Sequence, residues 1–398
     1  MQMLSFVFNS LTLAAFAAAQ SGQTPLNSHL EGWQFEHYDN VPGLDRNLDE
    51  LRLVQFSLDS EPEWMTERER FQAKAIGRNF MDITDTPLLG TLSQKPNFSY
   101  PSPNSTIVSK VFSYLSTAEP KANLEHFTSY HNRYYDSDLG KASSDWLFAK
   151  ILLYTAELAS EEQRPLITVE SLKHPWKQNS IVIRISPLDA VDSDPTTILG
   201  AHIDSVNHKD PVFGKAPGAG DDGSGTVAIL EAYRALLVAG YVPISPIEFH
   251  FYAGEEGGRR GSQAIASSFE NAGKAVRGMM QFDMTAFHKS GTREEIAVLT
   301  NGDTADASLT EFLISVIERY LDIPWVKDAY PDYASSDDES WRKAGYQTCH
   351  PLEGQFKNTN PYVHTPDDRI DISPEFSFDH MLHFSKLAVA FAIEMSSY

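Results

Sequence analysis

The second half of the chain alternates between apolar runs and amphipathic stretches, and this alternation constrains the fold more than any other feature. Four segments are typical of strands, at residues 180–185, 196–201, 247–253 and 277–284. Helices are expected between and after them, at residues 223–237, 262–272, 309–321 and 376–395. Apolar strands that alternate with helices predict an α/β sheet covered on both faces. In such sheets, sites form beyond the carboxyl ends of the strands.

The composition is that of a globular protein, with 41% hydrophobic and 22% charged residues in a chain of 398. It excludes a fully disordered, collagen-like or polytopic membrane protein. The chain has 54 acidic and 32 basic residues, a net charge of −22. Because phosphate contacts need Lys and Arg, nucleic acid is not an expected partner. A single cysteine, Cys349, excludes a disulfide within the chain and is expected to be an inert core residue.

The amino terminus is typical of a signal peptide. Residues 1–19 carry no charged side chain and end in Ala17, Ala18 and Ala19, which resemble a small-residue cleavage site. A short buried helix is the alternative, and the run is too short to predict a membrane span. Two N-glycosylation sequons, at Asn97 and Asn104, fit a secreted protein.

The region before the expected sheet contains three recognisable segments. Residues 62–80 mix apolar and charged side chains in a pattern that predicts an amphipathic helix. Residues 94–106 are rich in Pro, Ser and Asn and indicate a linker. Residues 144–159 predict a strong helix with Ser143 as its cap.

Residues with metal-binding side chains stand where the expected strands end. His202 and Asp204 follow the strand at 196–201, and residues two apart on a strand point the same way. A carboxylate in that position can take the second ring proton of a metal-bound histidine and fix its tautomer. By itself, such a pair is more often a surface histidine beside an acid.

Further motifs occupy equivalent positions. They are the acids of a glycine-rich loop, a glutamate pair, an acid after Phe282 and a loop histidine, namely Asp221, Asp222, Glu255, Glu256, Asp283 and His364. Each has an ordinary alternative reading, such as a helix cap at Asp222, a surface glutamate pair or a salt-bridge partner. In the last loop, Asp367 or Asp368 could orient His364.

Taken together, these residues point to one site. Two imidazoles and three carboxylates suit two zinc ions with one shared carboxylate, and one glutamate remains free as a base. Five acid or imidazole positions at strand ends are hard to obtain by chance, so the sequence predicts a metal centre at this edge of the sheet.

On these motifs the sequence resembles the two-zinc aminopeptidases of peptidase family M28, and within it the secreted fungal leucine aminopeptidases. Residues 79–85 are similar to the end of their propeptide, and residues 127–146 to the start of their mature domain. The resemblance implies a three-layer α/β/α fold with a mixed, mostly parallel central sheet. It also implies a signal peptide at 1–19, a removable propeptide at 20–87 that restrains activity or assists folding, and a catalytic domain at 88–398.

The resemblance implies a role for each site residue. His202 and Asp283 would bind one zinc ion, Glu256 and His364 the other, and Asp221 would bridge both, next to a cis peptide bond to Asp222. Three residues would be catalytic. Asp204 would orient His202, Glu255 would be the general base, and Tyr333 would help to hold the tetrahedral intermediate. An apolar substrate pocket would be lined by Met284, Phe356 and Val363.

The chain departs from the secreted relatives at three positions. Ser335 replaces a cysteine that they commonly pair, Asp338 replaces a usual histidine, and Thr359 stands where some have a pocket tyrosine. The proposed ligands are retained, so the departures bear on substrate preference before they bear on activity.

We therefore expect a secreted, glycosylated, monomeric zinc aminopeptidase with two zinc ions. It would remove leucine or other large apolar residues from peptides with a free amino terminus and have no nucleic-acid or membrane partner. The alternatives are a single-zinc glutaminyl cyclase, a carboxypeptidase of the neighbouring zinc exopeptidase group, and a non-catalytic binding protein on the same scaffold.

Overall fold

The computed structural model describes residues 47–92, 95–191, 193–301, 305–331 and 334–398. The expected signal peptide, the first part of the expected propeptide up to residue 46, and Tyr333 lie outside these ranges. In the described part of the chain, every helix is too short or too polar to span a bilayer.

A six-stranded sheet forms the centre of the molecule. Its strand order is β11 (Thr348–Cys349), β8 (Val276–Gln281), β6 (Thr196–His202), β7 (Ile247–Tyr252), β5 (Ser180–Ile185) and β4 (Ile167–Leu172). The pairs β6–β7, β6–β8 and β8–β11 are parallel, whereas β5 pairs antiparallel with β4 and β7. The expectation of a mixed, mostly parallel sheet is confirmed.

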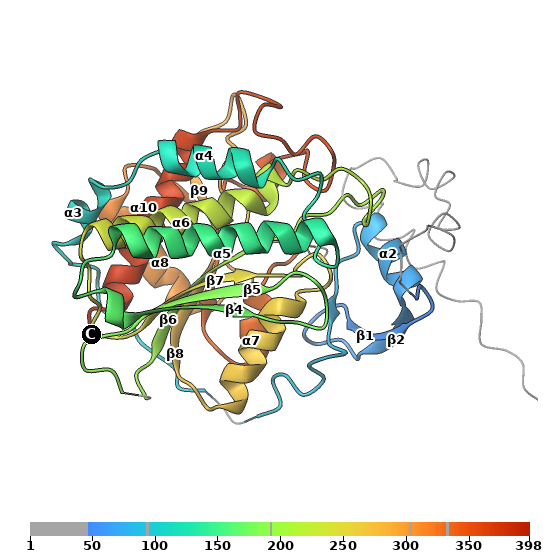
Figure 1. Cartoon of the computed structure of the whole chain (residues 1–398), viewed down its shortest axis with the longest axis horizontal. Helices are drawn as coiled ribbons and strands as arrows, with labels where there is room; N and C mark the ends of the chain where they lie inside the picture. Colours follow the sequence, from blue (N-terminus) through green and yellow to red (C-terminus); the bar gives the residue numbers. More distant parts are fainter. Residues whose placement is uncertain (1–46, 93–94, 192, 302–304, 332–333) are drawn as a thin grey trace, which may run out of the picture.

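Helices cover both faces of this sheet (Figure 1). One face carries α3 (Val108–Phe112), α4 (Ala118–Phe127), α5 (Asp138–Leu158), α6 (Gly225–Val238), α8 (Ala307–Tyr320) and α10 (Phe378–Met395). The other face carries α7 (Arg260–Asn271) and α9 (Asp338–Lys343). Side chains alternate between the two faces along each strand. Leu199 of β6 therefore packs with the helices of the first face, and Ile198 packs with α7 and α9 on the other. The predicted three-layer architecture is therefore confirmed.

A smaller unit from the segment before residue 87 lies beside this core. It consists of the antiparallel sheet β2–β1–β3, with β1 (Leu51–Gln55), β2 (Glu63–Thr66) and β3 (Met81–Asp82), and of helix α2 (Glu67–Ala75). Figure 1 shows these elements together at one end of the molecule. The single helix predicted at 62–80 is wrong at both ends. Its first residues pair with β1, and a capping box between Thr66 and Glu69 begins the helix later.

Two other sequence expectations need correction. Helix α5 begins at Asp138, and the Ser137 side chain caps it by accepting the Gly140 N–H at 2.9 Å, so Ser143 is a buried residue inside the helix and not its cap. The segment 95–106 has no helix or strand, as expected of a linker, but the Tyr100 hydroxyl donates to the Arg277 carbonyl at 2.9 Å. The segment is thus docked on the core.

The remaining elements complete the layers around the sheet. A second small sheet has the order β10 (Trp325–Asp328), β9 (Ile296–Leu299) and β12 (Pro351–Leu352). Short helical turns are η4 (Arg164–Leu166), η5 (Ala219–Ser224) and η6 (Phe356–Asn358). Cys349 on β11 is free and buried, and burial raises the pKa of its thiol, as expected of an inert core residue.

Candidate metal centre

The carboxyl ends of three neighbouring parallel strands supply most of the predicted site. β6 ends at His202, Glu255 and Glu256 follow the end of β7, and Asp283 follows the end of β8. Because β6 pairs in parallel with both β7 and β8, all three strands end at the same edge of the sheet. The topology therefore brings together residues that are far apart in the sequence.

Asp221 lies between the two histidines of the site. It comes from η5, the turn that precedes α6, and its peptide bond to Asp222 is cis, as the resemblance implied. Its Oδ1 is 2.9 Å from Nε2 of His202, and its Oδ2 is 2.8 Å from Nε2 of His364. Each carboxylate oxygen of Asp221 thus faces a different imidazole.

Each imidazole also faces one further carboxylate. Nε2 of His202 is 3.7 Å from Oδ2 of Asp283, and Nε2 of His364 is 3.4 Å from Oε1 of Glu256. The five predicted ligands therefore converge as two imidazole–carboxylate groups that share Asp221.

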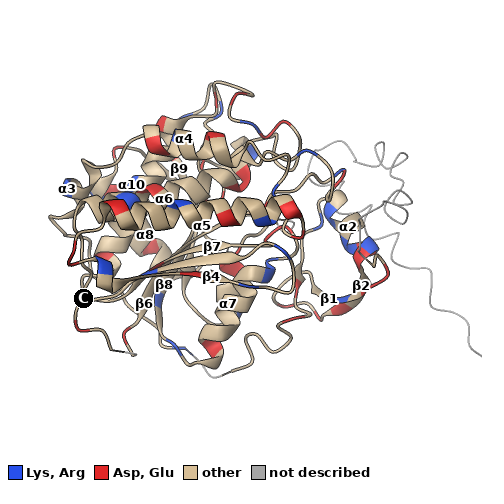
Figure 2. Ribbon diagram, in the orientation of Figure 1, with Lys and Arg blue, Asp and Glu red and all other residues tan. Residues whose placement is uncertain are grey.

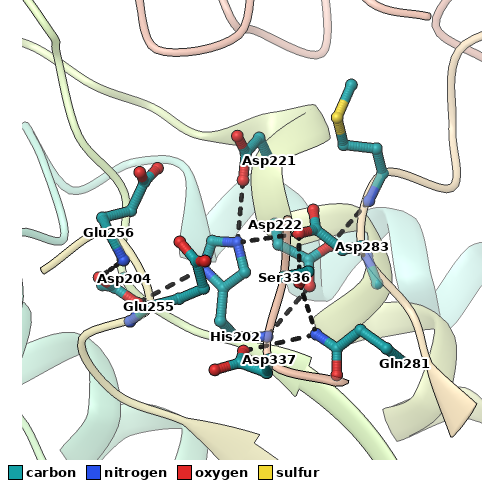
Figure 3. Close-up of polar contacts among 12 residues, drawn as sticks. His202, Asp204, Asp221, Asp222, Glu255, Glu256, Gln281, Asp283, Ser336 and Asp337 are labelled. Atoms are coloured by element: carbon teal, nitrogen blue, oxygen red, sulfur yellow. Dashed lines mark hydrogen bonds and ion pairs between the residues drawn. The ribbon is translucent and has the colours of Figure 1, made fainter. Parts of the chain in front are cut away.

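Asp204 supports both the first histidine and the glutamate pair. Its Oδ1 is 3.4 Å from Nδ1 of His202 and accepts the Glu255 N–H at 3.1 Å, while its Oδ2 accepts the Glu256 N–H at 3.0 Å (Figure 3). The predicted position of Asp204 behind His202 is therefore present in the structure. The contacts with the two glutamate amides were not foreseen from the sequence.

Asp222 ties three segments together at the centre. Its Oδ2 accepts the His202 N–H at 3.1 Å, and its Oδ1 accepts the N–H groups of Gly225 at 2.9 Å and Met284 at 3.3 Å. The helix-cap reading of Asp222 and the site reading are thus compatible, since the same carboxylate meets the start of α6 and the strand ends.

The last loop departs from its expected arrangement. Asp368 does not orient His364; its carboxylate accepts the backbone N–H groups of Gly220 and Asp221 at 2.9 and 3.0 Å. It therefore positions the backbone of the shared carboxylate. Asp367 is exposed.

Charge is concentrated in this buried site. Burial opposes the charge of the His202 imidazole, yet Asp283, Asp204 and Asp221 hold its pKa well above the ordinary value. Burial opposes the charge of Asp221 as well, but His364 and His202 hold its pKa well below the ordinary value. Burial raises the pKa of Glu255 well above the ordinary value, although Lys74 and His202 oppose the shift. The site thus holds several acids that need positive charge nearby.

The donor atoms fit zinc. Several buried carboxylate oxygens have no hydrogen-bond partner among the described residues, namely both oxygens of Glu256, Oε1 of Glu255 and Oδ1 of Asp283. Leaving a buried carboxylate oxygen without a hydrogen bond costs free energy, and a bound cation would remove this cost. Imidazole nitrogens and carboxylate oxygens are the ligands that zinc takes in hydrolytic sites.

Two groups of potential ligand atoms stand out by their spacing. His202, Asp221 and Asp283 form one, and His208, Glu256 and His364 form the other, with the atoms of each group within 4.8 Å of one another. His208 is the one member that the sequence reasoning missed, because a histidine in a loop has no periodic or strand-end signal.

Comparison with known proteins gives the family. Residues 180–389 match the sequence profile of Peptidase family M28. The chain belongs to peptidase family M28. Leucine aminopeptidase 1 of Fusarium vanettenii is 38% identical, with 88% of each chain covered. Leucine aminopeptidase 1 of Grosmannia clavigera is 41% identical, over 84% of this chain and 83% of the relative. The recognition of this family from the sequence, and the expectation of a metallo-aminopeptidase, are confirmed.

Solved structures of related proteins share the fold of this M28 peptidase. The LapA aminopeptidase of Legionella pneumophila is 25% identical, with a TM-score of 0.74 over 88% of this chain and 99% of that chain. A glutaminyl cyclase of Tannerella forsythia is 15% identical, with a TM-score of 0.51 over 70% of this chain and 98% of that chain, a likeness of fold alone.

The predicted pocket residues of the M28 peptidase also lie together. Met284, Tyr330 and Leu352 belong to one buried apolar cluster, against which Phe356 and Val363 pack. Met284 directly follows Asp283, so this cluster adjoins the ligands. The structure therefore brings the expected pocket residues to the edge of the candidate metal centre.

Proposed function

We propose that this M28 peptidase is a secreted, monomeric aminopeptidase with two zinc ions that removes leucine or other large apolar residues from peptide amino termini. The observation that carries the proposal is the Asp221 carboxylate, whose two oxygens lie 2.9 and 2.8 Å from Nε2 of His202 and His364. A carboxylate between two imidazoles is suited to bridge two metal ions.

The proposed ligand sets follow from the distances on either side of Asp221. His202 and Asp283 would bind one ion, and Glu256 and His364 the other. The Ser336 hydroxyl donates to Oδ2 of Asp283 at 2.6 Å and helps to fix its orientation. A pair of zinc ions, when bound, supplies an acidified water and a Lewis acid for the scissile carbonyl.

Glu255 is the proposed general base. Its carboxyl is buried beside the ligands, and Oε1 has no hydrogen-bond partner among the described residues. It would accept the proton of the attacking water and deliver it to the leaving amine. Asp204 would act as a positioning residue, because it holds the amides of Glu255 and Glu256 and also faces His202.

The apolar cluster supports the proposed substrate preference. Met284, Phe356 and Val363 would line the pocket for the amino-terminal side chain. The names of the relatives, which are leucine aminopeptidases, agree with an apolar residue at this position. Tyr333 keeps its proposed role with the tetrahedral intermediate from the resemblance alone.

The proposed processing divides the chain into a signal peptide at 1–19, a propeptide at 20–87 and a catalytic domain at 88–398. Contacts around the glutamate pair support a restraining propeptide. The Arg70 guanidinium of α2 donates to the Gly257 carbonyl, and the Asp82 N–H donates to the Gly258 carbonyl at 3.0 Å. Asn97 and Asn104 are exposed, which agrees with their proposed glycosylation in a secreted protein.

Hydrolysis of leucine p-nitroanilide by the processed protein tests this function. We expect activity that a chelator removes and added zinc restores, and no cleavage of a peptide acetylated at its amino terminus. Metal analysis should give two zinc ions per chain. One zinc per chain together with cyclisation of an amino-terminal glutamine, read by product mass, would favour the glutaminyl cyclase alternative.

A further inference from the structure

His208 is not among the ligands of the proposed function, yet it lies directly against the metal centre. It sits on the loop that follows β6, and its ring stacks on the ring of His364, with centroids 3.9 Å apart and an interplanar angle of 29°. The backbone N–H of His208 donates to the backbone carbonyl of His364 at 3.1 Å. Two loops that are distant in the sequence are thus joined through these histidines.

One ring nitrogen of His208 is free to bind a metal ion. Its Nε2 is buried and has no hydrogen-bond partner among the residues that the structure describes. A buried ring nitrogen without a partner is costly, and such exceptions call for an explanation. The ligand atoms of His208, Glu256 and His364 lie within 4.8 Å of one another. Those of His202, Asp221 and Asp283 lie within the same distance of one another.

We propose that His208 is a further protein ligand on the Glu256–His364 half of the metal centre, an inference that rests on the proposed two-zinc site. This half would then have four protein ligands, Asp221, Glu256, His364 and His208. The other half would have three, His202, Asp221 and Asp283.

The unequal ligand sets predict different zinc affinities for the two halves. Zinc usually takes four ligands and can expand to five, so the His208 half would still take part in catalysis. Imidazole also suits zinc well as a ligand. With one ligand more, the His208 half would therefore hold its ion more tightly than the His202 half.

Metal titration of the full-length chain tests this inference without reference to activity. The protein is depleted with a chelator, and zinc affinities are measured by competition with a chromophoric chelator. Cobalt absorption spectra then report the ligands of each ion. The key variant is His208→Phe, which keeps a ring against His364 but removes both nitrogens. The matched control is His174→Phe, because His174 also stacks on an aromatic ring, that of Trp176, with centroids 4.3 Å apart.

We expect wild type to bind two ions, one more tightly than the other. In His208→Phe the tighter affinity should fall by at least about tenfold, with a changed cobalt spectrum, since even residues outside the ligand shell alter affinity 10–100-fold. His174→Phe should bind as wild type does. If His208→Phe fails to fold, judged by circular dichroism of the metal-free protein, His208→Ala should show the same loss.

Two results would overturn the inference in distinguishable ways. Wild-type affinities and spectra in a folded His208→Phe protein would mean that His208 only stacks on His364, and the two-zinc proposal would stand. Binding of fewer than two ions by the wild-type chain would remove the proposed centre itself, and the role of His208 with it.

Discussion

The ammonium of Lys74 lies 3.8 Å from Oε2 of Glu256, whose Oε1 faces His364. Lys74 belongs to α2, within the proposed propeptide, and only 8% of the residue is exposed. A positive charge from the proposed propeptide therefore reaches a carboxylate that we propose as a zinc ligand. The contact gives the proposed restraint a specific residue to test.

Replacing Lys74 with Met in the uncleaved chain should raise its aminopeptidase activity. The variant keeps the apolar stem but removes the charge beside Glu256, which weakens the docking of α2 over the site. We expect a rise of about tenfold, equivalent to about 1.4 kcal/mol. The measurement is the rate of leucine p-nitroanilide hydrolysis before and after propeptide cleavage.

Lys343→Met is the matched control for this experiment. The Lys343 ammonium donates to the Gln55 side chain of β1, so it also links the catalytic part to the segment before residue 87. It does so without contacting a proposed ligand. An equal rise in both variants would mean that any loss of docking frees the site and that Lys74 has no special part.

Asp82→Asn should loosen the proposed propeptide. The Asp82 carboxylate is buried and lies 2.9 Å from Arg52, 3.2 Å from Arg70 and 3.9 Å from Arg260. Arg70 keeps Glu67, and Arg52 and Arg260 keep Asp85, but the variant removes the buried charge that all three guanidinium groups share. We therefore expect a loss below about 3–5 kcal/mol, the value for a fully broken buried pair. Limited proteolysis should then cut the segment before residue 87 faster. Asp85→Asn, at a half-exposed partner of Arg52 and Arg260, should have a smaller effect.

The same carboxylate predicts how acid affects the docking. Burial opposes its charge, but Arg70, Arg260 and Arg52 lower the pKa of Asp82 to about 2 from an ordinary 3.8. Since the folded pKa lies below the unfolded one, the stabilisation is complete above pH 3.8 and is lost as the pH falls toward 2. Unfolding measured between these pH values should be less pH-dependent in Asp82→Asn than in wild type.

Glu255→Gln should retain metal and lose turnover. The amide cannot accept a proton, so kcat should fall by about 10²–10⁴-fold, the range of general-base catalysis. Metal content, measured by atomic emission, should equal that of wild type. Normal turnover in this variant would remove Glu255 from the mechanism, whereas loss of metal would identify it as a ligand.

Asp204→Asn should weaken both metal binding and catalysis. The two carboxylate oxygens of Asp204 accept the backbone N–H groups of Glu255 and Glu256. An asparagine keeps one acceptor oxygen but turns its amide NH₂, a donor, toward one of these two N–H groups. We expect zinc affinity to fall about 10–100-fold, as for other groups that orient metal ligands. Competition titration measures this change. An unchanged affinity with reduced kcat would limit Asp204 to positioning Glu255.

The sheet could be predicted because its strands are apolar and continuous. The bounds of β5 agree with those expected at 180–185, where Ile and Val dominate. The expected strand at 277–284 ends earlier, at Gln281, because the backbone leaves the sheet and reaches a φ of 64° at Met284. The error at 62–80 has another cause. The pairing of β2 with β1 depends on a distant partner, which local amphipathic periodicity does not reveal.

The candidate site was predictable for a similar reason. Parallel strands place their carboxyl ends together, so acids and histidines after β6, β7 and β8 were expected to meet. Residues that act through loop contacts were not predictable. His208 depends on the approach of the His364 loop, and Asp368 turns to the Gly220 and Asp221 amides instead of His364.

Asp222 has a consequence for the order in which the centre is assembled. Its carboxylate is engaged by amides from β6, from the start of α6 and from the turn after β8, which are separate stretches of chain. A partly folded molecule in which these stretches have not yet met would lack a complete set of ligands. Zinc should therefore bind late, after the stretches have come together. A shortage of zinc would then yield a folded but inactive enzyme and not a misfolded chain.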